Sequence, residues 1–195
     1  MKLGVLFSGG KDSCYALYKA SKEHRIIVLI TIDSENQDSY MFHTPVDRTK
    51  ILAEKLDIPQ IIIKTKGEKE KEIGDLKIAI KKAKEDFKIE GIVTGAIASN
   101  YQASRIQKIC DELDLSCINP LWQKPQEELI RELVEKEFKI RIVKVAAEGI
   151  DESWVGKYLD KEMIDKLLEL KEKYGINVAG EGGEYESEVE EFPDE

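Results

Sequence analysis

The chain has 195 residues, a formal net charge of −9 and 42% hydrophobic residues. This length allows one large domain, or one domain with a smaller second part. No apolar run approaches the roughly 20 residues that a membrane-spanning helix requires, and the first residues do not resemble a signal peptide. We therefore expect a cytoplasmic protein without membrane contact. Three cysteines without a C-x-x-C pair argue against a disulfide framework or a structural zinc site.

The negative charge is concentrated at the C-terminus. Residues 181–195 include eight acidic and no basic residues, whereas the preceding 180 residues carry 30 basic and 31 acidic ones. The body of the chain is therefore close to neutral. It has no basic stripe of the kind that binds a nucleic-acid backbone, so we expect no nucleic acid among its partners.

The first 120 residues have the pattern of alternating strands and helices. Apolar or β-branched runs predict strands at residues 3–7, 26–32, 61–63, 91–94 and 117–118. Helical spacing and capping signals predict helices at residues 11–24, 44–56, 68–87, with a break at Gly74, and 100–113. The pattern indicates an α/β fold, an open five-stranded parallel sheet with helices on both faces.

The pattern changes after the fifth strand. Residues 125–138 predict a helix and residues 140–145 an alternating strand, and Asp160 and Gly175 are the expected cap and end of a further helix. We therefore place a boundary near residues 119–123, followed by a small C-terminal α/β domain.

Residues 8–13, with the sequence SGGKDS, join the first strand to the first helix. Adjacent glycines let backbone N–H groups approach an anion, and the helix N-terminus adds unpaired donors and a positive dipole end. The segment therefore predicts a phosphate-binding loop, in which Lys11 follows the phosphate and Asp12 caps the helix or meets a magnesium ion. It is not a Walker A loop, because the residue five positions before Gly10 is Val5. The alternative is an ordinary glycine turn.

Unusual polar and aromatic residues follow the second strand. Ligands of open parallel sheets bind beyond the carboxyl ends of the strands, where the strand order reverses. Asp33 stands at this position. Tyr40 and His43 follow it, and they either contact a ligand or only precede the next helix.

A second polar segment, residues 95–105, follows the fourth strand. Gly95 allows close backbone approach, and Arg105 lies one turn into the helix, where it can reach a phosphate or carboxylate. Some of the polar residues are only caps, because Ser99 or Asn100 would cap any helix that begins here.

The glycine-rich C-terminal segment contains Glu181, Glu184 and Glu186. Carboxylates at such spacing can coordinate magnesium or receive an ammonium group. From composition alone, residues 188–195 are better described as a disordered acidic tail, whereas the glycines indicate a formed loop at residues 180–185.

SGGKDS resembles the PP-loop of the ATP pyrophosphatases, which split ATP between its α and β phosphates. SYMFHT (39–44), GAIASNYQ (95–102) with Arg105, PLW (120–122) and GEGGEYE (180–186) extend the resemblance in the same order over nearly the whole chain. Together these segments resemble the diphthine–ammonia ligase (diphthamide synthetase) family. Ser187 departs from the threonine that the family often has there, and the residues after it are unlike the family's.

The resemblance implies an adenine nucleotide alpha hydrolase-like fold, with a PP-loop ATP-binding domain at residues 1–120 and a substrate-binding domain at residues 121–195. It also implies ATP-dependent amidation of diphthine on translation elongation factor 2, with Mg²⁺ as a cofactor and free ammonia as the nitrogen source. One alternative is a PP-loop enzyme that modifies transfer RNA, which the missing C-x-x-C pairs and basic surface disfavour. Another is a nucleotide-binding sensor without catalysis. A homo-oligomer is compatible with the sequence.

The resemblance and the residue patterns together assign roles to the polar positions. The expected catalytic residues are Lys11, Asp12, Arg105, Glu181 and Glu184; those that bind the nucleotide are Ser8, Gly9, Gly10, Lys11, Asp12, Ser13, Ile32, Asp33 and Gly95; those that bind the substrate are Tyr40, His43, Ser99, Tyr101, Gln102 and Glu186; the expected metal ligand is Asp12.

Overall fold

The computed structural model describes residues 1–36, 46–68 and 70–193. These residues divide into two compact units, Met1–Trp122 and Gln123–Glu195. Tyr40 and His43, which the sequence offered as substrate contacts, lie outside the described residues. Among the helices of the described residues, none combines the length and the apolar character needed to cross a membrane.

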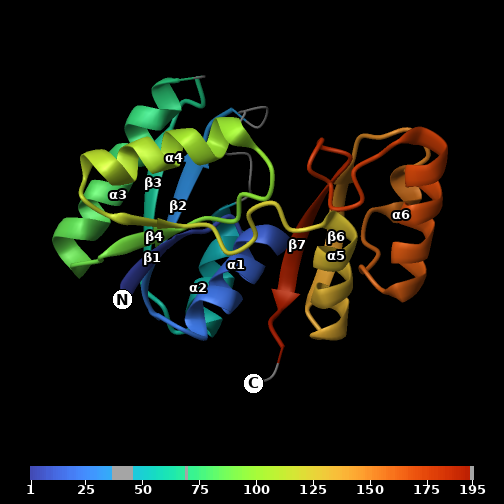
Figure 1. The fold of residues 1–195 in the computed structure, drawn as a ribbon, viewed down its shortest axis with the longest axis horizontal. Helices are drawn as coiled ribbons and strands as arrows, with labels where there is room; N and C mark the ends of the chain where they lie inside the picture. Colours follow the sequence, from blue (N-terminus) through green and yellow to red (C-terminus); the bar gives the residue numbers. More distant parts are fainter. Residues whose placement is uncertain (37–45, 69, 194–195) are drawn as a thin grey trace. The chain divides into compact units, whose positions relative to one another are not determined.

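The N-terminal unit is built on a parallel five-stranded sheet in the order β3-β2-β1-β4-β5 (Figure 1). Its strands are β1 (Lys2–Leu6), β2 (Arg25–Ser34), β3 (Gln60–Thr65), β4 (Gly91–Val93) and β5 (Ser116–Ile118). The chain adds β2 and β3 on one side of β1, and then crosses over to add β4 and β5 on the other. The predicted open parallel sheet is confirmed, and the strand order reverses between β1 and β4.

Helices cover both faces of this sheet. α1 (Lys11–Ser21) and α2 (Val46–Lys55) lie on one face, and α3 (Lys71–Phe87) and α4 (Asn100–Glu112) lie on the other (Figure 1). Because both faces of the central strands are covered, their sequences are nearly continuous apolar runs. The core beneath α3 and α4 is formed by buried aliphatic side chains of strands and helices, among them Val28, Ile30, Ile92, Leu76, Ile80, Ile106 and Ile109.

The predicted break at Gly74 is wrong, because α3 continues through this residue. A Cβ atom at Gly74 would meet no atom within 4 Å, so the glycine lies at an open position of the helix. One glycine in a helix costs only about 1 kcal/mol relative to alanine, which the buried face of α3 offsets.

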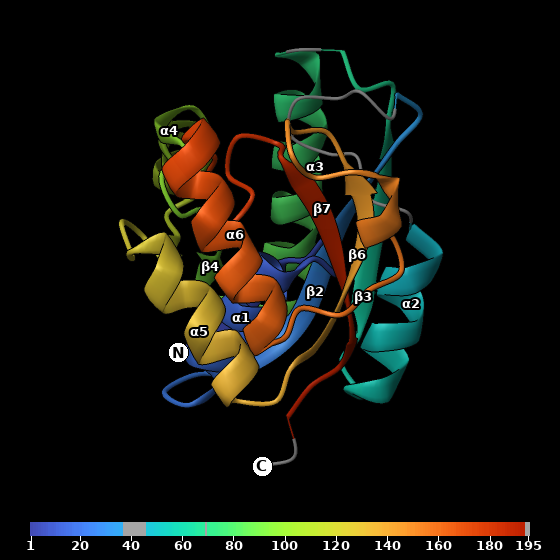
Figure 2. The same ribbon diagram turned by 90° about the vertical axis from the view of Figure 1, so that its right-hand side faces the viewer.

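The C-terminal unit combines a two-stranded antiparallel sheet with two helices (Figure 2). Its elements are α5 (Gln126–Glu135), β6 (Lys139–Val145), a 3-10 turn (Glu152–Trp154), α6 (Lys161–Tyr174) and β7 (Tyr185–Glu191). The Asp160 side chain accepts a hydrogen bond from the backbone N–H of Met163 at 2.8 Å, and Gly175 ends α6 with a φ of 70°. Both predicted boundaries of this helix are therefore confirmed.

The acidic C-terminal residues form a strand as far as Glu191, so the prediction of a disordered tail from residue 188 is wrong over this part. Val189 is buried and pairs in register with Ile140 of β6. Arg141 of β6 donates from Nε to Glu188 at 3.0 Å and lies 3.1 Å from Glu190. Composition assigned these carboxylates to a tail because the basic side chains that face them lie more than 40 residues earlier in the sequence.

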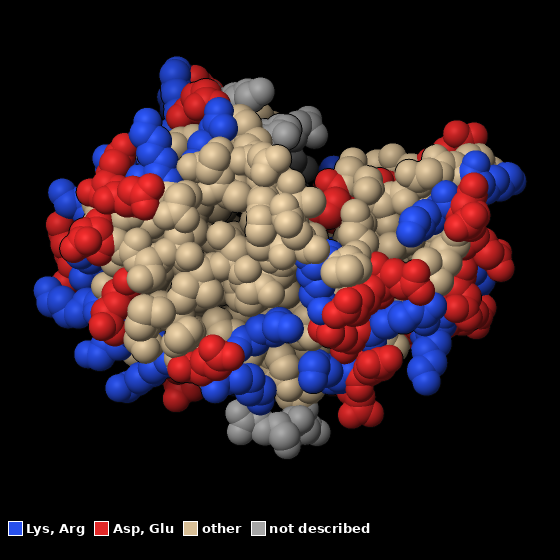
Figure 3. All heavy atoms as spheres, viewed as in Figure 1, with Lys and Arg blue, Asp and Glu red and all other residues tan. Residues whose placement is uncertain are grey.

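Elsewhere the surface carries both signs of charge. Figure 3 shows Lys and Arg side chains intermixed with Asp and Glu around a broad area of uncharged residues. Several charged side chains of the described residues form exposed ion pairs, such as Lys77 with Glu112 at 2.6 Å and Lys82 with Asp86 at 2.7 Å. Pairs at such exposed positions are screened by water and contribute little to the fold.

The burial of Val189 tests whether β7 belongs to the folded unit. Its side chain is 1% exposed, so Val189→Asp should place a carboxylate in the core and destabilise the C-terminal unit by about 3 kcal/mol or more. Thermal and urea denaturation followed by circular dichroism would measure this loss. Glu191→Gln, at an exposed position of the same strand, should change the stability very little. Equal, negligible effects of the two substitutions would show that β7 does not contribute to the folded unit.

Candidate active site

The loop of residues 8–13 joins the carboxyl end of β1 to α1. Gly9 has a φ of +75°, in the left-handed region that strains residues with a side chain. Gly10 is the N-cap residue of α1, and no side chain caps this helix. The first-turn N–H groups and the positive end of the helix dipole therefore form the kind of site that attracts an anion.

The two serines of the loop connect its ends. The backbone N–H of Ser8 donates to Ser13 Oγ at 3.2 Å, and the N–H of Gly10 donates to Ser8 Oγ at 3.3 Å. Ser13 Oγ also donates to the carbonyl of Gly10 at 3.1 Å. These bonds close the loop around the start of α1.

Lys11 and Asp12 form an ion pair at the helix N-terminus. The Lys11 Nζ lies 2.9 Å from both carboxylate oxygens of Asp12. The lysine side chain is 5% exposed, whereas that of Asp12 is 29% exposed, so the ammonium is enclosed while the carboxylate reaches solvent. Asp12 lies in the first turn and does not cap the helix, so the capping role considered for it is wrong.

Gly95 follows β4, the strand beside β1, and brings its segment against the same helix N-terminus. A Cβ atom at this position would lie 2.8 Å from the backbone carbon of Asp12 and 2.8 Å from the backbone nitrogen of Ser13. Such distances are too short for a side chain. The close approach that the sequence predicted at Gly95 is therefore made to the backbone of α1.

Two further nucleotide-binding candidates lie near the carboxyl end of β2. Ile32 is buried and pairs in register with Ile63 of β3. Asp33 is partly buried and pairs with Lys64. Both residues lie on the strand, which continues to Ser34.

The polar residues at the start of α4 divide into a cap and a cluster. Ser99 Oγ accepts a hydrogen bond from the N–H of Gln102 at 3.3 Å, which is the capping role that the sequence left open. The guanidinium carbon of Arg105 lies 3.4 Å from the centre of the Tyr101 ring, stacked on its face.

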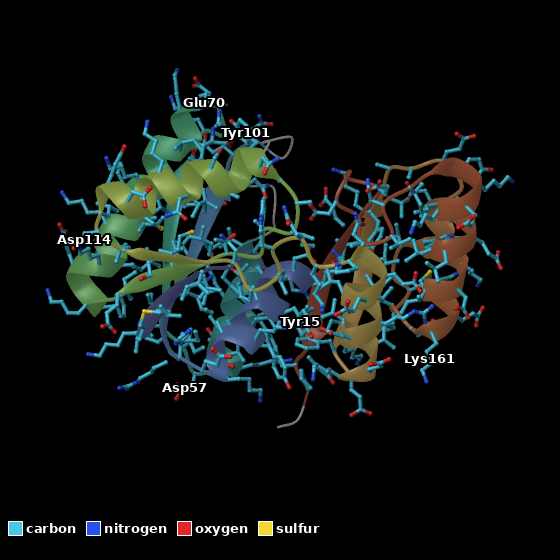
Figure 4. All side chains as sticks on the ribbon, in the orientation of Figure 1. Tyr15, Asp57, Glu70, Tyr101, Asp114 and Lys161 are labelled. Atoms are coloured by element: carbon cyan, nitrogen blue, oxygen red, sulfur yellow. The ribbon has the colours of Figure 1, made fainter. Side chains whose placement is uncertain are left out.

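Glu70, just before α3, completes this cluster. Its Oε1 accepts from the Tyr101 hydroxyl at 2.8 Å and lies 2.5 Å from Nη2 of Arg105. Figure 4 labels Glu70 and Tyr101 at neighbouring ends of α3 and α4. Burial and the hydrogen bond to Glu70 raise the pKa of Tyr101, so its hydroxyl stays protonated and remains a donor at neutral pH. The sequence did not predict a role for Glu70, because this residue stands next to a lysine-rich helix that has the composition of a solvated surface.

In the C-terminal unit, Glu184 is buried and holds its own loop together. Its Oε1 accepts from the backbone N–H and the side-chain Nδ2 of Asn177, both at 2.8 Å. Its Oε2 accepts from the N–H of Gly182 at 2.8 Å. A Cβ atom at residue 182 would lie 2.7 Å from Glu184 Oε1, so a side chain at this position would press on the carboxylate and displace it from these bonds.

Burial alone raises the pKa of the Glu184 carboxyl, but the hydrogen bonds from Asn177 and Gly182 outweigh burial. The net pKa lies below its usual value, so the group is a carboxylate at neutral pH. Glu181 lies in the same loop and is partly exposed. Glu186 lies on β7, where its carboxylate pairs with Lys144 at 3.2 Å.

Within the described residues, no group of three or more His, Cys, Asp or Glu side chains is arranged to hold a metal ion. Cys14, which follows the loop of residues 8–13, is fully buried, and burial raises the pKa of its thiol. It is therefore a core residue.

Two family models match the chain. The model described as the diphthamide synthase N-terminal domain matches residues 1–117, and that described as the diphthamide synthase C-terminal domain matches residues 125–193. The residues between the two matches include the boundary between the two compact units.

Known relatives match over the same extent. A human diphthine–ammonia ligase is 39% identical to this chain, in an alignment that covers 96% of this chain and 78% of the relative. A diphthine–ammonia ligase of Schizosaccharomyces pombe is 35% identical, covering 99% of this chain and 35% of the relative. A solved structure named as a predicted subunit of tRNA methyltransferase from Methanocaldococcus jannaschii is 21% identical, with a TM-score of 0.51 over 100% of this chain and 99% of that chain. This last likeness supports the fold alone.

The lowered pKa of Glu184 predicts an acid-sensitive contribution to stability. A carboxyl whose pKa is depressed by folding stabilises the protein fully above its ordinary pKa, which is 4.5 for glutamate, and loses this effect as the pH falls through the lower pKa of the folded state. Glu184→Gln should therefore reduce the unfolding free energy by roughly 1–3 kcal/mol near pH 7. The difference from the wild type should shrink below about pH 4.

Urea denaturation over a series of pH values would measure this difference. Glu172→Gln, at an exposed position of α6, is the matched control and should show a small difference at every pH. A Glu184→Gln protein as stable as the wild type at pH 7 would contradict the role of this carboxylate in the loop.

Proposed function

The chain belongs to the diphthamide synthase family, and from this premise we propose that it is an ATP-dependent ligase that amidates diphthine on translation elongation factor 2. The observation that carries the proposal is the extent of the match, because known diphthine–ammonia ligases align with 96% of this chain at up to 39% identity. Their names favour a ligase over a transfer RNA-modifying enzyme or a sensor. We place the reaction in the cytoplasm, with free ammonia as the nitrogen source.

The loop of residues 8–13 fits the phosphate chain of ATP. Gly9 adopts a conformation that favours glycine, and α1 begins without a side-chain cap, so its first-turn donors are oriented toward an anion. The enclosed ammonium of Lys11 adds positive charge at the same place. We therefore assign ATP binding to the N-terminal unit, with Ile32 and Asp33 near the adenosine.

The reaction has two steps. An oxygen of the diphthine carboxylate attacks the α phosphorus, the bond from this phosphorus to the bridging oxygen breaks, and pyrophosphate leaves with that electron pair. The nitrogen of ammonia then attacks the acyl carbon, AMP leaves, and one proton is released. Lys11 and the N–H groups of α1 stabilise the negative charge that develops on the departing pyrophosphate.

Asp12 is the residue that would hold Mg²⁺. Magnesium in such enzymes usually keeps several waters and takes one or two carboxylates together with substrate phosphates, so a single carboxylate at the loop is sufficient. Bound there, the ion would offset the negative charge of the phosphates. The solvent-reaching carboxylate of Asp12 supports this assignment.

In this proposal the remaining polar residues bind the diphthine carboxylate and ammonium. Arg105 and Tyr101, with Gln102 beside them, bind the substrate carboxylate, because a guanidinium recognises carboxylates with paired hydrogen bonds. Glu181 receives ammonium in the C-terminal, substrate-binding unit. Glu184 acts through the loop, because both of its oxygens accept bonds from that loop. Tyr40, His43 and Glu186 complete the proposed substrate contacts.

The products of the reaction test the function. The purified protein, given ATP, ammonium and diphthine-bearing elongation factor 2, should release AMP and pyrophosphate in equal amounts and convert the carboxyl to an amide, as shown by chromatography and mass spectrometry. Without ammonium, labelled pyrophosphate should still exchange into ATP while amide formation stops. The appearance of ADP and phosphate, or no turnover with this substrate, would contradict the proposed ligase.

A substitution at Gly95 tests the ATP site. The methyl group of Gly95→Ala would press on the backbone of Asp12 and Ser13 and displace the first turn of α1, so the Kd for ATP should rise roughly tenfold or more. Isothermal titration would measure it. Gly74→Ala adds the same methyl group in open space and should leave the Kd unchanged while stabilising α3 by about 0.5–1 kcal/mol. Equal ATP affinities for the two variants would contradict the proposal that the contact between Gly95 and the first turn of α1 supports the ATP site.

A further inference from the structure

Gln126, the first residue of α5, forms hydrogen bonds with both the oxygen and the nitrogen of its side-chain amide, and both bonds go to residues 177–179. Its Oε1 accepts a hydrogen bond from the backbone N–H of Ala179 at 3.0 Å. Its Nε2 donates to Oδ1 of Asn177 at 3.1 Å. The two bonds join α5 to the residues that lead into the loop of residues 180–184, which carries Glu181.

The bonds continue from Asn177 to Glu184. Asn177 Nδ2 donates to Glu184 Oε1, and Gly182 N–H donates to Glu184 Oε2, each at 2.8 Å. Tyr185, which follows the loop, connects it to the residues that precede it, because its hydroxyl donates a hydrogen bond to the carbonyl of Val178 at 2.8 Å. Side-chain hydrogen bonds therefore hold the loop at both of its ends.

The chemistry of this set requires an amide at residue 126. One end must accept from a backbone N–H and the other must donate to a carbonyl oxygen, and a neutral glutamine does both. A glutamate would keep the acceptor, lose the donor and add a second negative charge to the network around Glu184. A leucine would leave the Ala179 N–H and the Asn177 oxygen without these partners, and unpaired polar groups in partly buried positions are costly.

We propose that Gln126 is a positioning residue for the amide-forming step, holding the loop of residues 180–184, and Glu181 with it, through Ala179 and Asn177. The inference rests on the proposed function, which places the ammonia step at this loop. Gln126 does not touch the reacting atoms. Its substitution should therefore affect the second half-reaction and leave the formation of the adenylate intact.

Two half-reactions measured on the full chain test the proposal. Gln126→Leu should lower the rate of amide formation by about tenfold to a hundredfold, because small displacements of catalytic groups have effects of this size. The exchange of pyrophosphate into ATP, with diphthine-bearing elongation factor 2 present, should stay within about twofold of the wild type. The matched control is Gln107→Leu on α4, where the glutamine donates one exposed hydrogen bond to Asp111 at 2.8 Å. It should change neither rate.

Hydrogen exchange provides a readout that does not depend on activity. In Gln126→Leu, the amides of residues 177–183 should exchange at least tenfold faster while those of β6 and α6 keep their wild-type rates. Gln126→Glu, which keeps the bond to Ala179, should show a smaller effect on exchange and guards against a leucine variant that fails to fold.

The outcomes separate the two proposals. Faster exchange confined to the loop, together with a selective loss of amide formation, supports the positioning role. Equal losses in both half-reactions, exchange that rises uniformly over the C-terminal unit, or unchanged amide formation would each overturn it. A wild-type protein that forms no amide would overturn the proposed function, while the exchange data would still show whether Gln126 holds the loop.

Discussion

The close contact between Gly95 and the first turn of α1 is the constraint on which the N-terminal unit depends. β1 and β4 are neighbours in the sheet, and each sends a loop from its carboxyl end toward the same place. A hydrogen atom in place of a methyl group at residue 95 lets the second loop reach the backbone of Asp12 and Ser13. The loop of residues 8–13 is thus supported from the side by the segment that follows a neighbouring strand, in addition to its own serine bonds.

The two glycine-rich segments of the chain are built on different physical grounds. In residues 8–13, the left-handed backbone conformation of Gly9 and the N-terminus of α1 together place unpaired N–H donors and a positive dipole end at the loop. In residues 180–184, a buried carboxylate accepts hydrogen bonds from backbone and side-chain donors, and Gly182 leaves room for it. The first arrangement is suited to an anion, and the second presents a formed acidic loop whose conformation depends on the charge of Glu184.

The parts of the structure that local sequence determines were predictable. The strands appear as apolar runs, SGGKDS stands between a strand and a helix, and Asp160 and Gly175 mark the ends of α6. The parts that depend on distant partners were not. Glu70 lies 31 residues before Tyr101, and Gln126 lies 53 residues before Ala179, so no local pattern connects them. For the same reason the sequence did not predict that β7 forms a strand, because its partners Ile140 and Arg141 lie on another strand, β6.

The pairing of β6 with β7 changes how the protein presents its charge to an approaching partner. Read as a sequence, the C-terminus is a concentrated negative pole, which would repel polyanions and attract cations from a distance. In the structure, Glu186, Glu188 and Glu190 each face a cation of β6. Opposite charges a few ångströms apart act as dipoles, whose field falls off faster with distance than that of a single charge. This strand therefore steers charged partners only weakly from a distance. A partner that touches it would instead be recognised at short range, through contacts with the individual positive and negative side chains of β6 and β7.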